Sequence, residues 1–437
     1  MSWKDLYKQK LVSVEEAAAA ISSNDRVWYP PCGSAPTDLI NALTKRYEEL
    51  ENVSMMTGLV LYPFEYMKGK FKGHLNHKTY FMGPLERRVY PEGNVEVVSY
   101  QFGMTDWVTI NRMKPNVLIT EVSPPDENGN MSYGPLGTFS NDTVAKMATK
   151  IIVQVNQETP FVYGESHAFI NVKDVTMICE ADHKVAELPN PPVEEIDKTI
   201  ASFIVERIRD GSTIQIGIGG LGNAIGYFLE NHKDLGVHTE MFVDSMVTLA
   251  EKGVINGTKK TLNPGEITCS FGIGSTKMYK YMHKNPALRT YPISYIADVG
   301  IIAQNDNFVS VNNGLMSDLT GQVCSESIGF NQFSGTGGQL NFVRGASESK
   351  GGQSFLCFHS VAKGKDGKLI SRINADLPPG AVITTPRTDT QFVVTEYGVA
   401  ELKGMSIPER VKAMIKIAHP DFRDQLMHDA KTNGLLF

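Results

Sequence analysis

Apolar and polar residues follow the clearest pattern between Gly211 and Asp244, in the stretch GSTIQIGIGGLGNAIGYFLENHKDLGVHTEMFVD. Ser212–Ile216 alternates and is rich in β-branched residues, which predicts a strand that leads into the glycines of GIGGLG. Apolar residues at helical spacing then predict a helix capped by Asn223, and VHTEMFV predicts a second strand that carries Glu240. This stretch is therefore expected to form a strand, a glycine loop, a helix and another strand.

The glycine loop allows three interpretations. Glycines between a strand and a helix let backbone N–H groups approach an oxyanion or a phosphate, and the helix N-terminus adds a partial positive charge. GIGGLG fits the dinucleotide fingerprint G-x-G-x-x-G, and Glu240, about twenty residues further on, would then bind a ribose hydroxyl. Alternatively, the loop binds part of an acyl thioester and Glu240 is a covalent nucleophile. In the third interpretation the loop is a structural turn and Glu240 an ordinary surface carboxylate.

The order of predicted elements occurs twice in the chain. AAAAISSNDRVWYPPCGSAPTDLINAL followed by ENVSMMTG matches FIVERIRDGSTIQIGIGGLGNAIGYFL followed by LGVHTEMF. Val27 and Ile214 then begin equivalent strands, and Cys32–Ser34 corresponds to the loop at Gly219–Gly220. The prolines of AELPNPPVEEIDKT interrupt regular structure between the two halves. We predict an α/β fold of two tandem, similar, open domains with mainly parallel sheets, one over residues 1–188 and one over 189–437.

Other segments add strands and small-residue loops. VLITEV at Val117–Val122 and KIIVQVN at Lys150–Asn156 are continuous apolar runs, which is typical of buried parallel strands. FSGTGGQLNFVRGA, from Phe333, suggests close approach of the backbone to a ligand. VAKGKDGKL contains Lys365 and fits either a ligand contact or a solvated hairpin tip. Ser406, with Pro408 after it, marks the start of an amphipathic helix.

Composition and charge exclude several classes of protein. The 437 residues, 41% of them hydrophobic, are enough for two or three domains with full cores. A net charge of −6 argues against a nucleic-acid partner. The charged start MSWKDLYKQKLVSVEE and the lack of a long apolar run predict a cytoplasmic protein without a membrane partner. The five cysteines are widely spread and form no C-x-x-C pair, so we expect buried free thiols and no metal site.

Five segments together resemble a known family. They are GIGGLGNAIG, HTEMFVDSMVTLAEKGVING, FSGTGGQLNFVRGA, VVTEYGVAELKG with IAHPDFRD, and SPPDENGNMSYGP in the first half. Their combination resembles the acetyl-CoA hydrolase/transferase group of class I coenzyme A transferases, with the strongest likeness to its butyryl-CoA:acetate and 4-hydroxybutyrate members. The likeness extends from Leu11 to about Leu426 and is weakest at YPPCGSAP.

The resemblance implies the CoA-transferase fold with an active site at the domain interface. It implies that Glu240 becomes acylated and then carries coenzyme A as a thioester. It also implies transfer between a short-chain acyl-CoA, of the butyryl or 4-hydroxybutyryl type, and a carboxylate such as acetate. Coenzyme A is then a substrate, with no permanently bound cofactor, and the protein is expected to form a homo-oligomer. The contacts with coenzyme A carry over to Gly217, Ile218, Gly219, Gly220, Leu221, Leu315, Gly338 and Lys365.

Such chemistry needs donors for two oxyanions, and we expect backbone N–H groups near Gly33 and near Gly219–Gly220 to supply them, with help from Gln215. Three alternatives stay open. Water could take the acyl group, which would make the protein an acetyl-CoA hydrolase. An NAD-dependent oxidoreductase would use the same loop but leaves the duplicated half unexplained. A non-catalytic ligand sensor would bind coenzyme A without needing Glu240.

Overall fold

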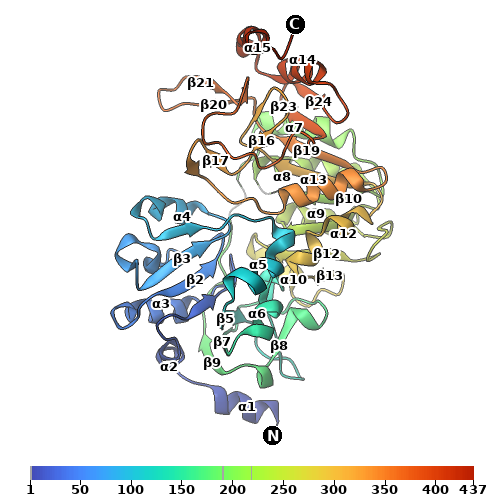
Figure 1. Cartoon of the computed structure of the whole chain (residues 1–437). Coiled ribbons are helices and arrows are strands. Elements are labelled where there is room, and N and C mark those ends of the chain that lie inside the picture. Colours follow the sequence, from blue (N-terminus) through green and yellow to red (C-terminus); the bar gives the residue numbers. More distant parts are fainter. Residues whose placement is uncertain (1, 189–190, 218) are drawn as a thin grey trace. The chain divides into compact units, whose positions relative to one another are not determined.

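The computed structural model describes residues 2–188, 191–217 and 219–437 (Figure 1). The chain divides into two compact units that are discontinuous in sequence. The first comprises Met1–Pro189, Glu240–Val243 and Thr268–Ile296, and the second comprises Asn190–Thr239, Asp244–Ile267 and Ala297–Phe437. Glu240 therefore belongs to the same unit as the first half of the chain, although its strand follows the glycine loop.

The first half forms a seven-stranded sheet in the order β4-β3-β2-β1-β5-β7-β9, and all of its pairs are parallel. All six residues of β5 are buried, as expected for a parallel strand that is covered on both faces. The predicted strands at Val117–Val122 and Lys150–Asn156 are confirmed as β5 and β7. The strands are β1 (Arg26–Trp28), β2 (Val53–Thr57), β3 (Leu75–Thr79), β4 (Val95–Val97), β5 (Val117–Val122), β7 (Lys150–Asn156) and β9 (Met177–Ala181).

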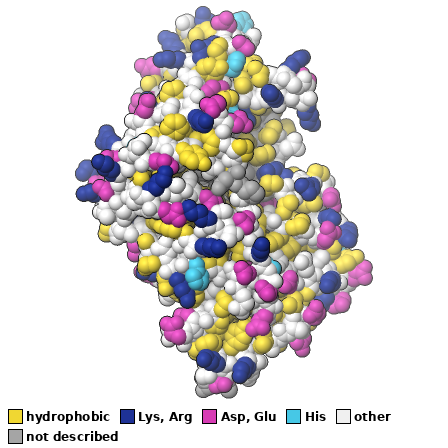
Figure 2. Space-filling view, turned by 180° about the vertical axis from the view of Figure 1, so that it is seen from behind, with side chains coloured by type: hydrophobic (Ala, Val, Ile, Leu, Met, Phe, Trp, Pro, Cys, Tyr) yellow, Lys and Arg dark blue, Asp and Glu magenta, His cyan; other side chains and the backbone are white. Residues whose placement is uncertain are grey.

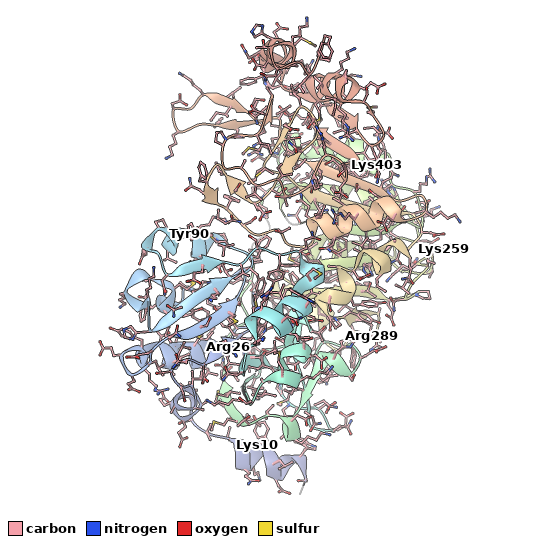
Figure 3. The ribbon with its side chains drawn as sticks, viewed as in Figure 1. Lys10, Arg26, Tyr90, Lys259, Arg289 and Lys403 are labelled. Carbon is pink, nitrogen blue, oxygen red and sulfur yellow. The ribbon has the colours of Figure 1, made fainter. Side chains whose placement is uncertain are left out.

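The first half also contains helices, some of which are held by polar side chains. Ser13 caps α2, and its partner in the capping box is Glu16, which satisfies N–H groups that would otherwise lack acceptors. Lys10, labelled in Figure 3, donates from Nζ to the carbonyls of Val172, Lys173 and Val175 and so ties α1 to the chain before β9. The helices are α1 (Trp3–Lys10), α2 (Val14–Ala19), α3 (Thr37–Lys45), α4 (Pro84–Val89), α5 (Thr105–Val108) and α6 (Asn141–Met147); β6 (Asn130–Ser132) pairs with β8 (Phe169–Asn171).

The second half forms an eight-stranded sheet in the order β13-β12-β11-β10-β14-β19-β23-β24. The neighbours of β10, β14 and β19 are parallel to them, whereas β24 is antiparallel to β23. Its strands are β10 (Thr213–Ile216), β11 (Gly236–Phe242), β12 (Ile267–Gly272), β13 (Leu288–Thr290), β14 (Phe308–Asn313), β19 (Gln353–Cys357), β23 (Phe392–Thr395) and β24 (Gly398–Glu401).

The two sheets share one strand order, which confirms the predicted duplication. Val27 in β1 pairs with Met55 and Val117, on the neighbouring strands β2 and β5. Ile214 in β10 pairs in the same way with Val237 and Val309, on β11 and β14. The α/β class with mainly parallel sheets is therefore confirmed, and β24 is an addition to the second sheet. The boundary near residue 189 stays a prediction.

The helices of the second half pack on its sheet, with α13 against β14 and β19 and α7 against β23. Ser406 caps α14 as predicted. The helix after the glycine loop starts at Gly220, so the prediction that Asn223 caps it is wrong. The helices are α7 (Glu195–Val205), α8 (Gly220–Phe228), α9 (Asp244–Glu251), α10 (Thr276–Met282), α11 (Ile293–Ile296), α12 (Val299–Ala303), α13 (Gln339–Glu348), α14 (Ile407–Ile417) and α15 (Pro420–Thr432).

The second half also contains short strands outside its eight-stranded sheet. They are β15 (Met316–Asp318), β16 (Val323–Cys324) and β22 (Ile373–Asn374) in one small sheet, and the pairs β17 (Ser327–Ile328) with β18 (Asn331–Gln332) and β20 (Val361–Lys363) with β21 (Leu369–Ser371). All five cysteines are free and buried, as predicted. No helix in the described part of the chain is both long and apolar enough to span a membrane. On the face shown in Figure 2, acidic and basic side chains are interspersed.

Candidate active site

Glu240 lies in β11. It is half-buried, whereas the other six residues of this strand are buried. It is close to the loop that follows β1. Burial, and then the charges of Glu86 and Glu240, raise the pKa of the Cys32 thiol well above its ordinary value. The structure therefore brings the predicted nucleophile near the small-residue loop of the first half, within one compact unit.

The loop at Cys32–Ser34 has an unusual backbone. Cys32 has a φ of 63°, in the left-handed region that L-residues other than glycine seldom adopt, and its N–H donates to the Leu59 carbonyl over 3.2 Å. The Gly33 carbonyl accepts a 3.2 Å hydrogen bond from the Tyr62 hydroxyl. A Cβ at Gly33 would lie 3.1 Å from Cγ1 of Val185, so the loop is closely packed where N–H donors were predicted.

The glycine loop of the second half joins the end of β10 to α8. The Gly217 N–H donates to the Val311 carbonyl over 2.9 Å, and Gly219, which precedes α8, has a φ of 117°. A Cβ at Gly222 would lie 2.2 Å from the Gly217 carbonyl oxygen, so this glycine allows the turn to close. Ile218, another predicted contact, lies outside the described residues.

Close packing is one reason for a glycine at position 220. A Cβ at this position would lie 2.6 Å from Oδ2 of Asp197 and 3.1 Å from the Pro192 carbonyl oxygen. Asp197 lies in α7 and contacts Nε2 of His359 through its other carboxylate oxygen at 2.8 Å. The missing side chain therefore lets α7 and α8 pack together, and Leu221 next to it is buried.

The remaining predicted contacts lie on separate elements. Leu315 follows β14, is half-buried, and donates its N–H to the Cys324 carbonyl over 2.8 Å. Gly338 is buried and caps α13. Lys365 is exposed at the tip of the β20–β21 hairpin, which matches the solvated-hairpin interpretation of its position. The structure thus brings the Gly217 end of the glycine loop to the end of β14, while Gly338 and Lys365 lie on other segments.

Two more side chains near these loops have partners. Gln215, expected to help bind an oxyanion, exchanges two hydrogen bonds with the Asn312 side chain, at 3.2 and 3.1 Å. His238 is buried, and its ring meets Phe308 edge-on with centroids 6.0 Å apart.

A charged pair that contacts the loop at Cys32–Ser34 through the Glu121 N–H was not identified from the sequence. Glu121 is fully buried in β5, and its carboxylate lies 2.8 Å from Nε2 of His183. The signal that could have revealed Glu121 is a single acidic residue inside the apolar run VLITEV, because a buried carboxylate requires partners. Nothing in EADHKVAEL marks His183 in advance. Within the described residues, no group of three or more His, Cys, Asp or Glu side chains could hold a metal ion.

Comparisons with known proteins give consistent results. The acetyl-CoA hydrolase/transferase N-terminal domain model matches residues 1–189, and the corresponding C-terminal domain model matches residues 274–430. The chain is 39% identical to 4-hydroxybutyrate coenzyme A transferase from Clostridium kluyveri, over 99% of each chain. It is 38% identical to butyryl-CoA:acetate CoA-transferase from Anaerostipes caccae, over 99% of this chain and 98% of the other. The crystal structure of RipA from Yersinia pestis superposes with a TM-score of 0.94 at 33% identity, over all of both chains.

Proposed function

The chain belongs to the acetyl-CoA hydrolase/transferase family and is a CoA-transferase, and we propose that it moves coenzyme A between a short-chain acyl-CoA and acetate through a thioester on Glu240. The family resemblance predicted from the motifs is thereby confirmed. The proposed donors are butyryl-CoA and 4-hydroxybutyryl-CoA, after the substrates named for the two relatives. Cytoplasmic location, homo-oligomer formation and the domain boundary stay predictions.

The observation that carries the proposal is the position of Glu240. It is the one half-buried residue in a strand that is otherwise buried, and its charge acts on the thiol of Cys32 in the loop after β1. A carboxylate that is held on a rigid strand and partly shielded from water suits a reaction that depends on proximity and on exclusion of water.

The proposed reaction has two halves, each of which exchanges one bond for another. An oxygen of Glu240 attacks the acyl-CoA carbonyl carbon, the C–S bond breaks, and an acyl-glutamyl anhydride and CoA thiolate form. The thiolate then attacks the glutamyl carbonyl carbon, the anhydride C–O bond breaks, and the first carboxylate leaves. Acetate reverses both steps on the resulting glutamyl-CoA thioester. Electrons and atoms balance without a metal or a redox cofactor.

The two small-residue loops are proposed to bind the substrates. Gly217, Gly219 and Leu221 come directly after β10, where parallel α/β sheets bind their ligands, and the first turn of α8 adds a partial positive charge. Gly220, with Ile218, belongs to the same proposed contact segment. Backbone N–H groups near Gly33 are proposed to face the second oxyanion. Leu315, Gly338 and Lys365 are proposed as further coenzyme A contacts.

Two alternatives are less well supported. A hydrolase is not favoured by the similar proteins, because both of the curated relatives described above are named as transferases. An NAD-dependent oxidoreductase would require Glu240 to bind a ribose, and the duplicated sheets and the family give no support for a dinucleotide. A coenzyme A sensor predicts that no covalent intermediate forms.

Mass spectrometry after incubation with butyryl-CoA tests the proposal. A tryptic peptide that contains Glu240 should gain the mass of coenzyme A less one water, as thioester formation requires, or yield the reduced alcohol after borohydride treatment. Glu240→Asp withdraws the carboxylate by about 1.5 Å, which should lower kcat by on the order of a hundredfold, whereas a ribose contact would tolerate it. An adduct on another residue, or transfer by Glu240→Ala, would sink the proposal.

A further inference from the structure

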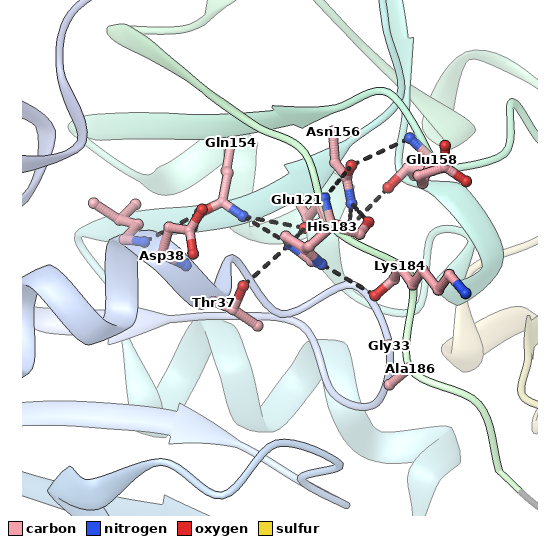
Figure 4. Close-up of polar contacts among 12 residues, drawn as sticks. Gly33, Thr37, Asp38, Glu121, Gln154, Asn156, Glu158, His183, Lys184 and Ala186 are labelled. Atoms are coloured by element: carbon pink, nitrogen blue, oxygen red, sulfur yellow. Dashed lines mark hydrogen bonds and ion pairs between the residues drawn. The ribbon is translucent and has the colours of Figure 1, made fainter.

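The carboxylate of Glu121 is surrounded by donors at the carboxyl end of the first sheet (Figure 4). Oε1 accepts from Oγ1 of Thr159 over 2.7 Å and from Nδ2 of Asn156 over 3.1 Å. Oε2 accepts from Nε2 of Gln154 over 3.1 Å and lies 2.8 Å from Nε2 of His183. Both oxygens are therefore satisfied, as a buried carboxylate requires.

His183 is the cationic partner of this carboxylate. Its Nε2 faces Glu121, and its Nδ1 lies 3.1 Å from the Lys184 carbonyl oxygen. Only an imidazolium donates from both ring nitrogens. The hydrogen bond to Glu121, and then its charge, raise the pKa of His183 to about 9 against burial. Asp38 of α3 adds to this effect, while the exposed Lys184 adjoins His183 in the chain.

One set of contacts joins the pair to the loop at Cys32–Ser34 and the helix after it. The Glu121 N–H donates to the Ser34 carbonyl over 3.1 Å. Oε1 of Gln154 accepts from the N–H groups of Asp38 and Leu39, at 3.1 and 3.0 Å, in the first turn of α3. Oγ1 of Thr37, which begins α3, lies 3.1 Å from Nε2 of His183.

A second set of contacts reaches Gly33 through the segment after His183. Nδ2 of Asn156 donates to the His183 carbonyl over 2.9 Å and so holds this segment at its start. Three residues further on, the Ala186 N–H donates to the Tyr62 hydroxyl over 3.1 Å, and that hydroxyl donates to the Gly33 carbonyl over 3.2 Å. The loop is thus held from two sides.

We propose that Glu121 and His183 are positioning residues for acyl transfer, which hold Cys32–Ser34 in the conformation that faces Glu240. The inference rests on the proposed function, in which this loop binds a substrate oxyanion. The backbone of Cys32, with a φ of 63°, gives the pair a task, because a residue in this region keeps its conformation only when its surroundings impose it. Glu121 and His183 contact Ser34 and the start of α3 on one side of the loop. On the other side they contact the segment that binds Tyr62, so together they impose the backbone conformation of Cys32.

Steady-state kinetics of Glu121→Gln and His183→Gln with butyryl-CoA and acetate test the proposal. Each variant should lower kcat about tenfold to a hundredfold while the KM for butyryl-CoA stays within about twofold, because a displaced donor affects the reaction more than substrate binding. The rate of adduct formation on Glu240 should fall by the same factor. Glu180→Gln is the matched control. Glu180 lies on β9 and its exposed carboxylate accepts a hydrogen bond from the Tyr7 hydroxyl, so this variant should keep the wild-type kcat.

The pH dependence separates positioning from simple structural support. As the pH rises through about 9, the wild type loses the His183 charge, so the ratio of its kcat to that of His183→Gln should approach one. This ratio cancels titration of the substrate thiol, which affects both proteins alike. The His183 side chain is 23% exposed, whereas the Glu121 side chain is fully buried, so a substitution at His183 disturbs folding less. His183→Gln therefore keeps the test valid if Glu121→Gln does not fold.

The outcomes distinguish this inference from the proposed function. An active wild type with unchanged kcat in His183→Gln overturns the inference alone. So does a loss that lies entirely in KM, a ratio that does not change with pH, or an equal loss in Glu180→Gln. A wild type that forms no adduct and transfers no coenzyme A overturns the proposed function, and the inference with it.

Discussion

The loops that follow β1 and β10 occupy equivalent places in the two halves but reach their shape by different means. Val27 and Ile214 have equivalent pairing partners, so Cys32 and Gly219, each five residues further on, correspond. Both have positive φ angles, of 63° and 117°. The second half uses glycine, which adopts such an angle without steric cost, whereas the first half uses cysteine and surrounds it with hydrogen bonds.

The acidic residues differ in the same comparison. By the strand pairings, Glu240 in β11 corresponds to Gly58, which follows β2, and Glu121 in β5 corresponds to Asn313 in β14. Each half therefore has one carboxylate that the other lacks. In the first half the carboxylate is buried and fully hydrogen-bonded, while in the second it is half-buried on its strand. The duplicated fold thus supplies equivalent positions, and burial decides whether a carboxylate there supports a loop or is open to a substrate.

The largest effect on activity should come from an alanine substitution at Glu240, and the same substitution at the equivalent Gly58 should act on stability instead. Glu240→Ala should abolish transfer, a loss of more than about a thousandfold, because it removes the group that forms the bond, while thermal unfolding changes little. Gly58→Ala should do the reverse, since its Cβ would lie 2.6 Å from the ring of Tyr80, and so should lower stability. Activity assays and thermal unfolding of both variants check this. Comparable loss of activity per folded molecule in both variants would break the comparison.

Much of this arrangement could be predicted from the sequence, because strand and loop signals are local. The strands at β5, β7 and β10, the duplication and the glycine loop follow from apolar runs and small residues. The sequence predicts Asn223 as the cap because amide side chains favour that place, yet Gly219 is the N-cap and the helix begins at Gly220, since the φ of 117° at Gly219 suits glycine. The pair of Glu121 and His183 could not be predicted, because its residues are far apart in the chain and meet only in the folded sheet.

A second prediction concerns the backbone of the glycine loop. Gly219→Ala places a side chain at a φ of 117° and should cost about 1–3 kcal/mol of stability or shift the loop. We expect kcat/KM for butyryl-CoA to fall about tenfold or more, because the N–H groups no longer meet the ligand. Gly253→Ala is the control: its φ is 76° and a Cβ there meets no atom within 4 Å. Both variants should unfold at lower urea concentration, but if both keep full activity the loop does not bind substrate.

A third prediction concerns the charge that supports the first loop. The pKa of His183 is about 9 in the folded protein, above its ordinary value of 6.5, so its contribution to stability is complete below pH 6.5 and is lost as the pH rises through 9. The difference in free energy of unfolding between the wild type and His183→Gln should therefore shrink by on the order of 2 kcal/mol between pH 6 and pH 10. Urea titrations across this range measure it. A difference that stays constant would mean that His183 is not charged by Glu121.

The smallest expected effect lies at the β20–β21 hairpin, which extends from the second half between β19 and β23. Between β7 and β9 the first half instead contains β8, which pairs with β6, so within the described residues the β20–β21 hairpin has no counterpart in the first half. Lys365 is exposed at its tip, and an exposed lysine that meets a phosphate contributes about 0.5–1 kcal/mol, because water and salt screen the charge. Lys365→Ala should therefore raise the KM for butyryl-CoA about twofold to fivefold at low salt, with kcat unchanged and no effect at about 0.5 M salt. The KM for a butyryl thioester of pantetheine, which lacks the phosphates, should not change.

Lys368→Ala is the matched control, because Lys368 carries the same charge on the same hairpin but lies 3.6 Å from the Asp366 carboxylate. An equal rise in KM for both variants would show that the hairpin acts through its general charge, and no rise for Lys365→Ala would remove this residue from the coenzyme A contacts.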